Sequence, residues 1–172
     1  TPKALTPEFG DKTFSRFADL RIDKYRSSLI VVCETHSNDE ASNTLVSNTL
    51  VSIPLDGSQQ LTTIASGFDF YSNPELSHDG KRLCWLCWNH PDMPWDSTQL
   101  WVAELDEKGA LRKPSPVAGE KENNESIFQP RWSPNDDLYY VSDRNNWWNL
   151  YKEGENKPIL NFPAEFATPQ WT

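Results

Sequence analysis

Two stretches of the sequence decide the fold: NPELSHDG at residues 73–80 and QPRWSPND at residues 129–136. Each is followed by an apolar run, a polar loop and a further apolar run, QLWV at 99–102 and NLYK at 149–152. The prolines of the two stretches lie 130 − 74 = 56 residues apart. A weaker copy starts at 19–23, and another starts with TPQW at 168–171. A repeat of about 40–55 residues with several short strands is typical of the blades of a β-propeller.

The apolar runs predict strands. The sequence has 13 prolines, which discourage long helices. Asp-Gly pairs at 56–57 and 79–80 lie between apolar runs, where glycine accepts the positive φ of a hairpin turn. The run LCWLCW at 83–88 is apolar at every position, so both faces of this strand need a cover. Stacked sheets provide that cover.

The repeats set the expected architecture. We expect the outermost strands at residues 60–62, 116–118 and 158–160. The sequence therefore predicts an all-β chain that forms a partial β-propeller of about three four-stranded antiparallel blades. Their expected bounds are roughly 14–67, 68–122 and 123–164, and residues 165–172 start the next blade.

Three blades do not make a closed propeller, which needs about four to eight. The two end sheets would each expose an apolar face, which monomeric proteins avoid. The chain also begins Thr1-Pro2-Lys3, with neither a methionine nor a leader segment. We therefore expect a fragment of a longer protein, and self-association through the open blade faces.

Composition excludes several classes of function. The 172 residues include 16 basic and 25 acidic side chains, a formal charge of −9, whereas nucleic-acid binders usually carry a basic face. No apolar run reaches the length of about 20 residues that a membrane helix needs. The three cysteines, at 33, 84 and 87, are too few for a disulfide-stapled secreted domain, so a cytoplasmic location is expected. Cys84 and Cys87 have no second pair that would complete a zinc site, and we expect buried thiols and no cofactor.

At this point a resemblance to a known family can be stated. Residues 77–83 (SHDGKRL), 88–96 (WNHPDMPWD) and 143–151 (DRNNWWNLY) resemble the N-terminal propeller of the prolyl oligopeptidase family, in particular its bacterial dipeptidyl aminopeptidase/acylaminoacyl-peptidase branch. The last two segments are the most specific, and the resemblance covers nearly the whole chain. His78 stands where the family usually has proline, and Asn135-Asp136 replaces its Asp-Gly; both changes are compatible with turns.

The resemblance implies a partner domain. In this family the propeller precedes an α/β-hydrolase domain whose nucleophilic serine lies in a G-x-S-x-G elbow. The seven glycines here, at 10, 57, 67, 80, 109, 119 and 154, frame no such serine. The chain itself is therefore expected to hydrolyse nothing, while the parent protein is expected to be a serine peptidase that admits only short peptides. The alternative is a stand-alone propeller that acts as a protein-interaction scaffold.

Five residues are candidates for contact with substrate. His90 and Asp92 lie in the segment WNHPDMPWD, which is either a stiff corner between two strands or a loop that lines a substrate chamber. Arg144 with Trp147 either ties a turn to the neighbouring blade or binds a peptide carboxylate or carbonyl. Glu125 belongs to an acidic loop that is either only solvated or, as the family resemblance implies, binds a free amino terminus. No metal ligand set is expected.

Overall fold

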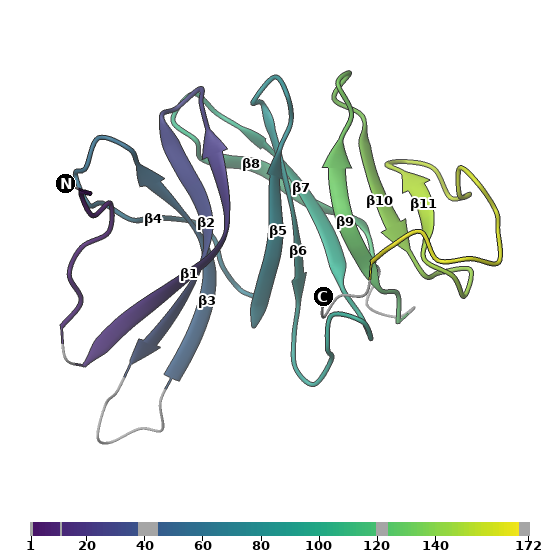
Figure 1. Ribbon diagram of the computed structural model, residues 1–172, viewed down its shortest axis with the longest axis horizontal. Helices are drawn as coiled ribbons and strands as arrows, with labels where there is room; N and C mark the ends of the chain where they lie inside the picture. The colour runs from purple at the N-terminus through teal and green to yellow at the C-terminus, as the bar shows by residue number, and fades with distance from the viewer. Residues whose placement is uncertain (1, 11, 38–44, 120–123, 169–172) are drawn as a thin grey trace.

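The computed structural model describes residues 2–10, 12–37, 45–119 and 124–168, and within these ranges all regular structure is β (Figure 1). The chain forms three antiparallel sheets in sequence order. The first sheet has the strands β1 (Thr13–Asp23), β2 (Ser28–Ser37), β3 (Leu45–Pro54) and β4 (Thr62–Ala65). The second has β5 (Phe70–Leu76), β6 (Arg82–Trp88), β7 (Gln99–Leu105) and β8 (Leu111–Ala118), and the third has β9 (Ile127–Trp132), β10 (Leu138–Ser142) and β11 (Asn149–Lys152).

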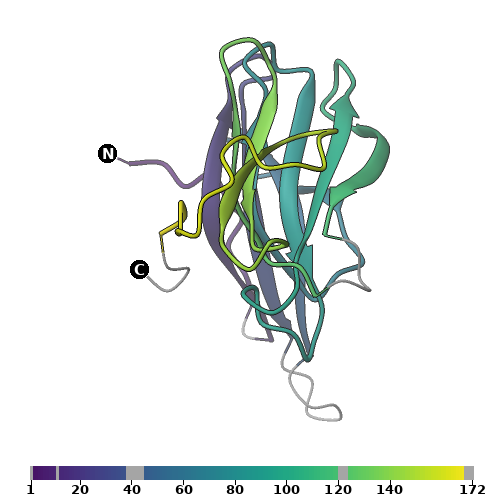
Figure 2. The same ribbon diagram turned by 90° about the vertical axis from the view of Figure 1, so that its right-hand side faces the viewer.

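Neighbouring sheets stack face to face. Strand β5 contacts β1, β2 and β3 of the preceding sheet, and β9 contacts β5, β6 and β7. The first strands of successive sheets therefore lie next to one another along one edge of the stack, as the innermost strands of propeller blades do. Seen along the stack, the three sheets overlie one another (Figure 2). The expected partial β-propeller is confirmed.

Each innermost strand carries a bulge at the same place in the repeat. Asp19, Asn73 and Gln129 have left-handed backbone conformations with φ between 49° and 52°. They are spaced 73 − 19 = 54 and 129 − 73 = 56 residues apart, and the pairing register shifts at each of them. A bulge bends its strand and increases the local twist. The sequence repeat is thus also a repeat of backbone geometry.

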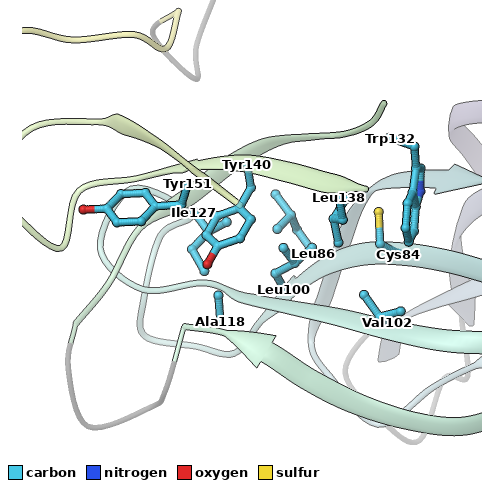
Figure 3. Packing of buried hydrophobic residues seen from close by; sticks show 10 residues of the cluster. All are labelled: Cys84, Leu86, Leu100, Val102, Ala118, Ile127, Trp132, Leu138, Tyr140 and Tyr151. Carbon is cyan, nitrogen blue, oxygen red and sulfur yellow. The ribbon is translucent and has the colours of Figure 1, made fainter. Parts of the chain in front are cut away.

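The middle sheet buries side chains on both faces. Leu83 and Trp85 of β6 pack into a core shared with the first sheet. Cys84 and Leu86, which point the other way, pack into a second core with Tyr140 and other residues of the third sheet (Figure 3). Each of these four residues of β6 is at most 3% exposed. The two-sided burial predicted for this strand is confirmed, because a sheet lies against each of its faces.

Charged side chains at equivalent positions join the three sheets. Arg21 Nη2 lies 2.5 Å and Arg131 Nη1 lies 2.7 Å from the same atom, Glu75 Oε1. Each of these residues stands two positions after the bulge residue of its strand. Trp132 Nε1 also donates a hydrogen bond to the backbone oxygen of Glu75 over 2.9 Å. These contacts align the inner edges of neighbouring blades.

The third sheet differs from the expectation, since its described part has three strands. Residues 158–160 form no strand, and one backbone bond, from Ile159 N to Leu150 O over 2.8 Å, marks the place of the missing one. The chain then turns towards Asn149. Its side-chain Nδ2 donates a hydrogen bond to Phe162 O over 3.0 Å, and its Oδ1 accepts one from the backbone N–H of Phe162 over 3.1 Å. These bonds hold residue 162 beside the start of β11.

The outermost strands of the other two sheets also differ slightly from expectation. Strand β4 covers residues 62–65 instead of the expected 60–62, and the expected 116–118 is the end of the longer strand β8. The start of a further blade was placed at 165–172, of which residues 169–172 lie outside the described part.

The two ends of the stack are covered differently. On the outer face of the first sheet, Val31, Cys33, Val51 and Ile53 are at most 3% exposed, and Leu5 of the N-terminal segment packs against this group. This face is not open, contrary to the expectation, because the chain folds back over it. At the other end, self-association stays a prediction that rests on four side chains that are 45–56% exposed: Ile159, Leu160, Phe162 and Phe166.

The end of β8 gives a sharp test of the packing. Gly119 has φ +81°, and a Cβ there would overlap the carbonyl oxygen of Thr98, just before the paired strand β7, and would lie 2.9 Å from Ile127 Cδ1 of the third sheet. We expect Gly119→Ala to lower the free energy of unfolding by about 3 kcal/mol, measured by urea denaturation.

Two other glycines serve as matched controls. Gly67 also has a positive φ, +109°, but has open space around it, so Gly67→Ala should cost about 1 kcal/mol. Gly10→Ala has neither problem and should leave stability unchanged within error. Equal losses for Gly119→Ala and Gly67→Ala would contradict the close approach of the backbone at Gly119 to Thr98.

Candidate functional site

All five predicted site residues lie in connections at one end of the sheets. In an antiparallel sheet alternate connections share an end. The connections at 89–98 and 143–148 and the one that enters β9 therefore lie together, along the lower edge of Figure 1. Ser126 joins them, because its Oγ donates to Pro94 O over 3.0 Å and its backbone N–H donates to Asp143 Oδ1 over 2.8 Å.

Glu125 and Arg144 form a paired centre at this end. The carboxylate of Glu125 is buried; its Oε1 accepts a hydrogen bond from Arg144 Nε at 2.9 Å and forms an ion pair with Arg144 Nη2 at 2.7 Å. The hydroxyl of Ser142 also donates to this oxygen. The guanidinium carbon lies 4.4 Å from the ring centroid of Tyr151 and 5.8 Å from that of Tyr140. The geometry favours the structural interpretation of this pair, because an incoming amine would have to displace a stacked guanidinium.

The ionisation of this centre is fixed by its surroundings. Burial by itself would lower the pKa of Arg144, but the nearby Tyr140 and Glu125 outweigh burial and raise that pKa, so the guanidinium stays charged. Burial raises the pKa of the Tyr140 hydroxyl, although Arg144 opposes the rise.

Ring contacts and backbone hydrogen bonds hold the segment 88–96 in place. The ring of Phe70 stacks on that of Trp88, with ring centroids 5.3 Å apart. It also forms an edge-to-face contact with His90, with ring centroids 4.9 Å apart. The backbone N–H of His90 donates to Asp69 Oδ2 over 3.0 Å, and a cis peptide bond joins His90 to Pro91. The backbone N–H of Asp92 donates a hydrogen bond to the backbone oxygen of Asn89 over 3.1 Å, which closes a turn. These contacts fit a stiff corner, and the choice between that and a loop that lines a substrate chamber stays a prediction.

The structure brings some of the candidates together and keeps others apart. Arg144 and Trp147 share one hairpin loop, and Arg144 pairs with Glu125. Within the described ranges, no hydrogen bond, ion pair or ring contact connects His90 or Asp92 with that pair. The contact roles predicted for the five residues stay predictions.

Two cavities open near these connections. One, of about 310 Å³, lies between β8 and the third sheet, and Glu125 and Arg144 line it. The other, of about 280 Å³, is lined by Asp19, Trp88 and Pro94 among others. Trp88 and Pro94 belong to the segment 88–96, one alternative for which is a chamber-lining loop, whereas Asp19 is not among the predicted site residues although it occupies the same repeat position as Asn73. That equivalence was the available signal.

Neither a cluster of metal-ligating side chains nor a membrane-spanning helix is found in the described part of the chain. In residues 2–10, 12–37, 45–119 and 124–168, no three His, Cys, Asp or Glu side chains gather as metal ligands. In the same ranges, no helix has the length and hydropathy to span a bilayer. The three cysteines are buried and unpaired.

Fold and loops together define this chain as a β-propeller segment with a polar and aromatic loop cluster at one end. No protein-family model and no curated protein matches the sequence. Solved structures do match. A puromycin hydrolase is 30% identical with a TM-score of 0.85, over 100% of this chain and 27% of that chain. A Mycobacterium tuberculosis puromycin-hydrolyzing peptidase is 35% identical with a TM-score of 0.79, over 91% and 25%.

A third solved structure, a mutant puromycin hydrolase complexed with PGG, is 30% identical with a TM-score of 0.78, over 92% of this chain and 25% of that chain. The present chain thus spans about a quarter of the length of each of these proteins. Its similarity is to one part of a hydrolase or peptidase chain.

The ion pair between Glu125 and Arg144 leads to a prediction about the loss of the Glu125 carboxylate. We expect Glu125→Gln to lower the free energy of unfolding by about 2 kcal/mol, because it leaves a partly buried guanidinium without its counter-charge. The matched control is Glu104→Gln, which removes a carboxylate that lies 3.4 Å from Lys113 on the exposed surface. That change should cost less than about 0.5 kcal/mol. Chemical denaturation measures both, and a Glu125→Gln protein as stable as the control would refute the structural role.

Proposed function

We propose that this chain is a non-catalytic propeller segment of a serine peptidase of the prolyl oligopeptidase family. One observation carries the proposal: nearly the whole chain matches, at 30–35% identity, a quarter of the length of proteins described as a puromycin hydrolase and a puromycin-hydrolyzing peptidase. Because the match covers only part of each of those chains, we assign this segment the role of a supporting domain.

The role of the segment in this proposal is to restrict access to a catalytic domain outside residues 1–172. The sequence contains no G-x-S-x-G elbow, so the nucleophile must lie elsewhere. Stacked sheets with filled cores are rigid, and a rigid wall beside an active site excludes substrates by size. Short peptides would then be the substrates of the parent protein.

The loop end is the surface that we assign to the catalytic domain. Met93 and Trp95, in the loop between β6 and β7, and Trp147, in the loop between β10 and β11, are 39–45% exposed there. Large aromatic side chains of this kind are enriched where proteins meet. An α/β-hydrolase domain that covers this end would bury them.

Two finer assignments belong to the same proposal. The segments 88–96 and 143–151 support the dipeptidyl aminopeptidase/acylaminoacyl-peptidase branch of the family, through the resemblance described above. The three unpaired cysteines support a cytoplasmic location, since thiols stay reduced in that compartment.

A labelling and hydrolysis experiment tests the proposal on the longer protein that contains residues 1–172. A fluorophosphonate probe should label a serine outside these residues. The labelled protein should cleave di- to tetrapeptides, slow down as peptides lengthen, and leave a folded protein intact. Absence of labelling, together with stable capture of a protein ligand by the loop end, would instead establish the alternative, an interaction scaffold.

Two variants connect size selection to the loop end. Trp147→Ala should loosen the contact with the catalytic domain and raise the rate for long peptides relative to short ones by several-fold. Leu55→Ala removes a side chain of similar exposure, 42%, from a turn at the opposite end and should leave the ratio unchanged. Equal ratios in both variants would contradict the assignment of this surface.

A further inference from the structure

A cavity of about 350 Å³ lies between the first and second sheets, and four aromatic residues line it: Phe68, Tyr71, Trp85 and Trp101. The rings of Trp85 and Trp101 stack, with ring centroids 6.3 Å apart. Phe68 makes edge-to-face contacts with Trp101 and Tyr71, at centroid distances of 5.7 and 6.2 Å. Because each ring is in contact with at least one other, the aromatic wall of the cavity is preformed.

The rest of the lining is uncharged. It consists of Ile64, Ala65, Ser66, Leu111 and Pro114, so none of the nine described residues around the cavity has a charged side chain. An ion would lose its hydration there without an opposite charge to compensate, which favours neutral ligands. A cavity of about 150 Å³ already holds one benzene ring, and small-molecule sites typically begin at about 300 Å³. The volume therefore suits a ligand of two fused rings.

The hydroxyl of Tyr71 provides a hydrogen-bond donor that the protein does not use. Tyr71 is 5% exposed, and its Oη accepts a hydrogen bond from the backbone N–H of Phe68 over 3.2 Å. Within residues 2–10, 12–37, 45–119 and 124–168, no atom accepts the proton of this hydroxyl. Burial raises the pKa of Tyr71 to about 12, so the proton stays on the hydroxyl at neutral pH. A buried donor without an acceptor costs free energy, and a ligand that brings an acceptor recovers it.

We propose that this cavity binds a neutral, planar aromatic molecule of up to two fused rings that carries one hydrogen-bond acceptor. The rings of the ligand pack against Trp85 and Trp101, and the Tyr71 hydroxyl donates its hydrogen bond to the acceptor. None of the five predicted site residues is among the residues that line this cavity. The proposal goes beyond the proposed function and does not depend on it, because it concerns binding alone.

Calorimetric titration of the purified protein with quinoline tests the site. Quinoline has two fused rings, is neutral at neutral pH and carries one acceptor nitrogen, so it should bind with a dissociation constant of about 1 mM or below. N-Methylquinolinium has the same rings, but its methyl group blocks the nitrogen and leaves a positive charge, so it should not bind measurably. Absence of quinoline binding, or equal binding of N-methylquinolinium, would overturn the proposal.

A second titration separates the hydrogen bond from the ring packing. Tyr71→Phe removes the donor and keeps the ring, so it should weaken the binding of quinoline about threefold to tenfold. Naphthalene has the shape of quinoline without the acceptor, and its affinity should be the same with and without the substitution. An unchanged affinity for quinoline, or an equal loss for both ligands, would contradict the hydrogen bond from Tyr71.

Filling the cavity locates the binding. Ala65→Leu adds three carbon atoms to the lining and should weaken the binding of quinoline and naphthalene about tenfold. Ser66→Leu, at the exposed rim, is a second blocking variant with the same expectation. The matched control is Ala164→Leu, which makes the same change as the first variant in the exposed segment after β11 and should leave both affinities unaltered. Thermal unfolding verifies the fold of each variant, and full affinity for quinoline in a folded blocking variant contradicts this location.

Discussion

Face-to-face burial of apolar side chains between neighbouring sheets is the interaction on which this structure depends. Strand β6 shows it most clearly, since Leu83 and Trp85 are buried against the first sheet while Cys84 and Leu86 are buried against the third. Truncating one such leucine to alanine typically costs about 2–5 kcal/mol, a large part of the stability of any domain. A strand that is apolar on both faces cannot remain at the surface of a single sheet.

The stack also determines where functional groups can lie. Because alternate connections of an antiparallel sheet share an end, the loops with His90, Arg144 and Trp147 form one surface, and Ser126 joins them by hydrogen bonds to the backbone and to Asp143. At the inner edge, the repeated bulges place Asp19 beside Asn73 of the next blade. The cavity there thus results from the same repeat that builds the blades.

The sequence predicted what repeats and missed what depends on single contacts. The two-sided run 83–88 and the blade starts were sufficient for the architecture. Neither the absence of a strand at 158–160 nor the hydrogen bonds between the side chain of Asn149 and Phe162 could be foreseen from the repeat. The two departures from the family pattern also prove to be partners, since the N–H of His78 donates to Asp136 Oδ1 over 2.5 Å. A proline at 78 has no N–H to donate, so a pairing between two turns that are 58 residues apart was invisible to local analysis.

Thiol reactivity measures the central claim most directly. Cys84 and Cys87 lie three positions apart in β6, on opposite faces, and both are fully buried, which also raises the pKa of each thiol. The account predicts that an alkylating reagent modifies neither in the native protein and both in urea, as peptide mass mapping would show. Modification of either cysteine in the native protein at the rate found in urea would contradict a sheet covered on both faces.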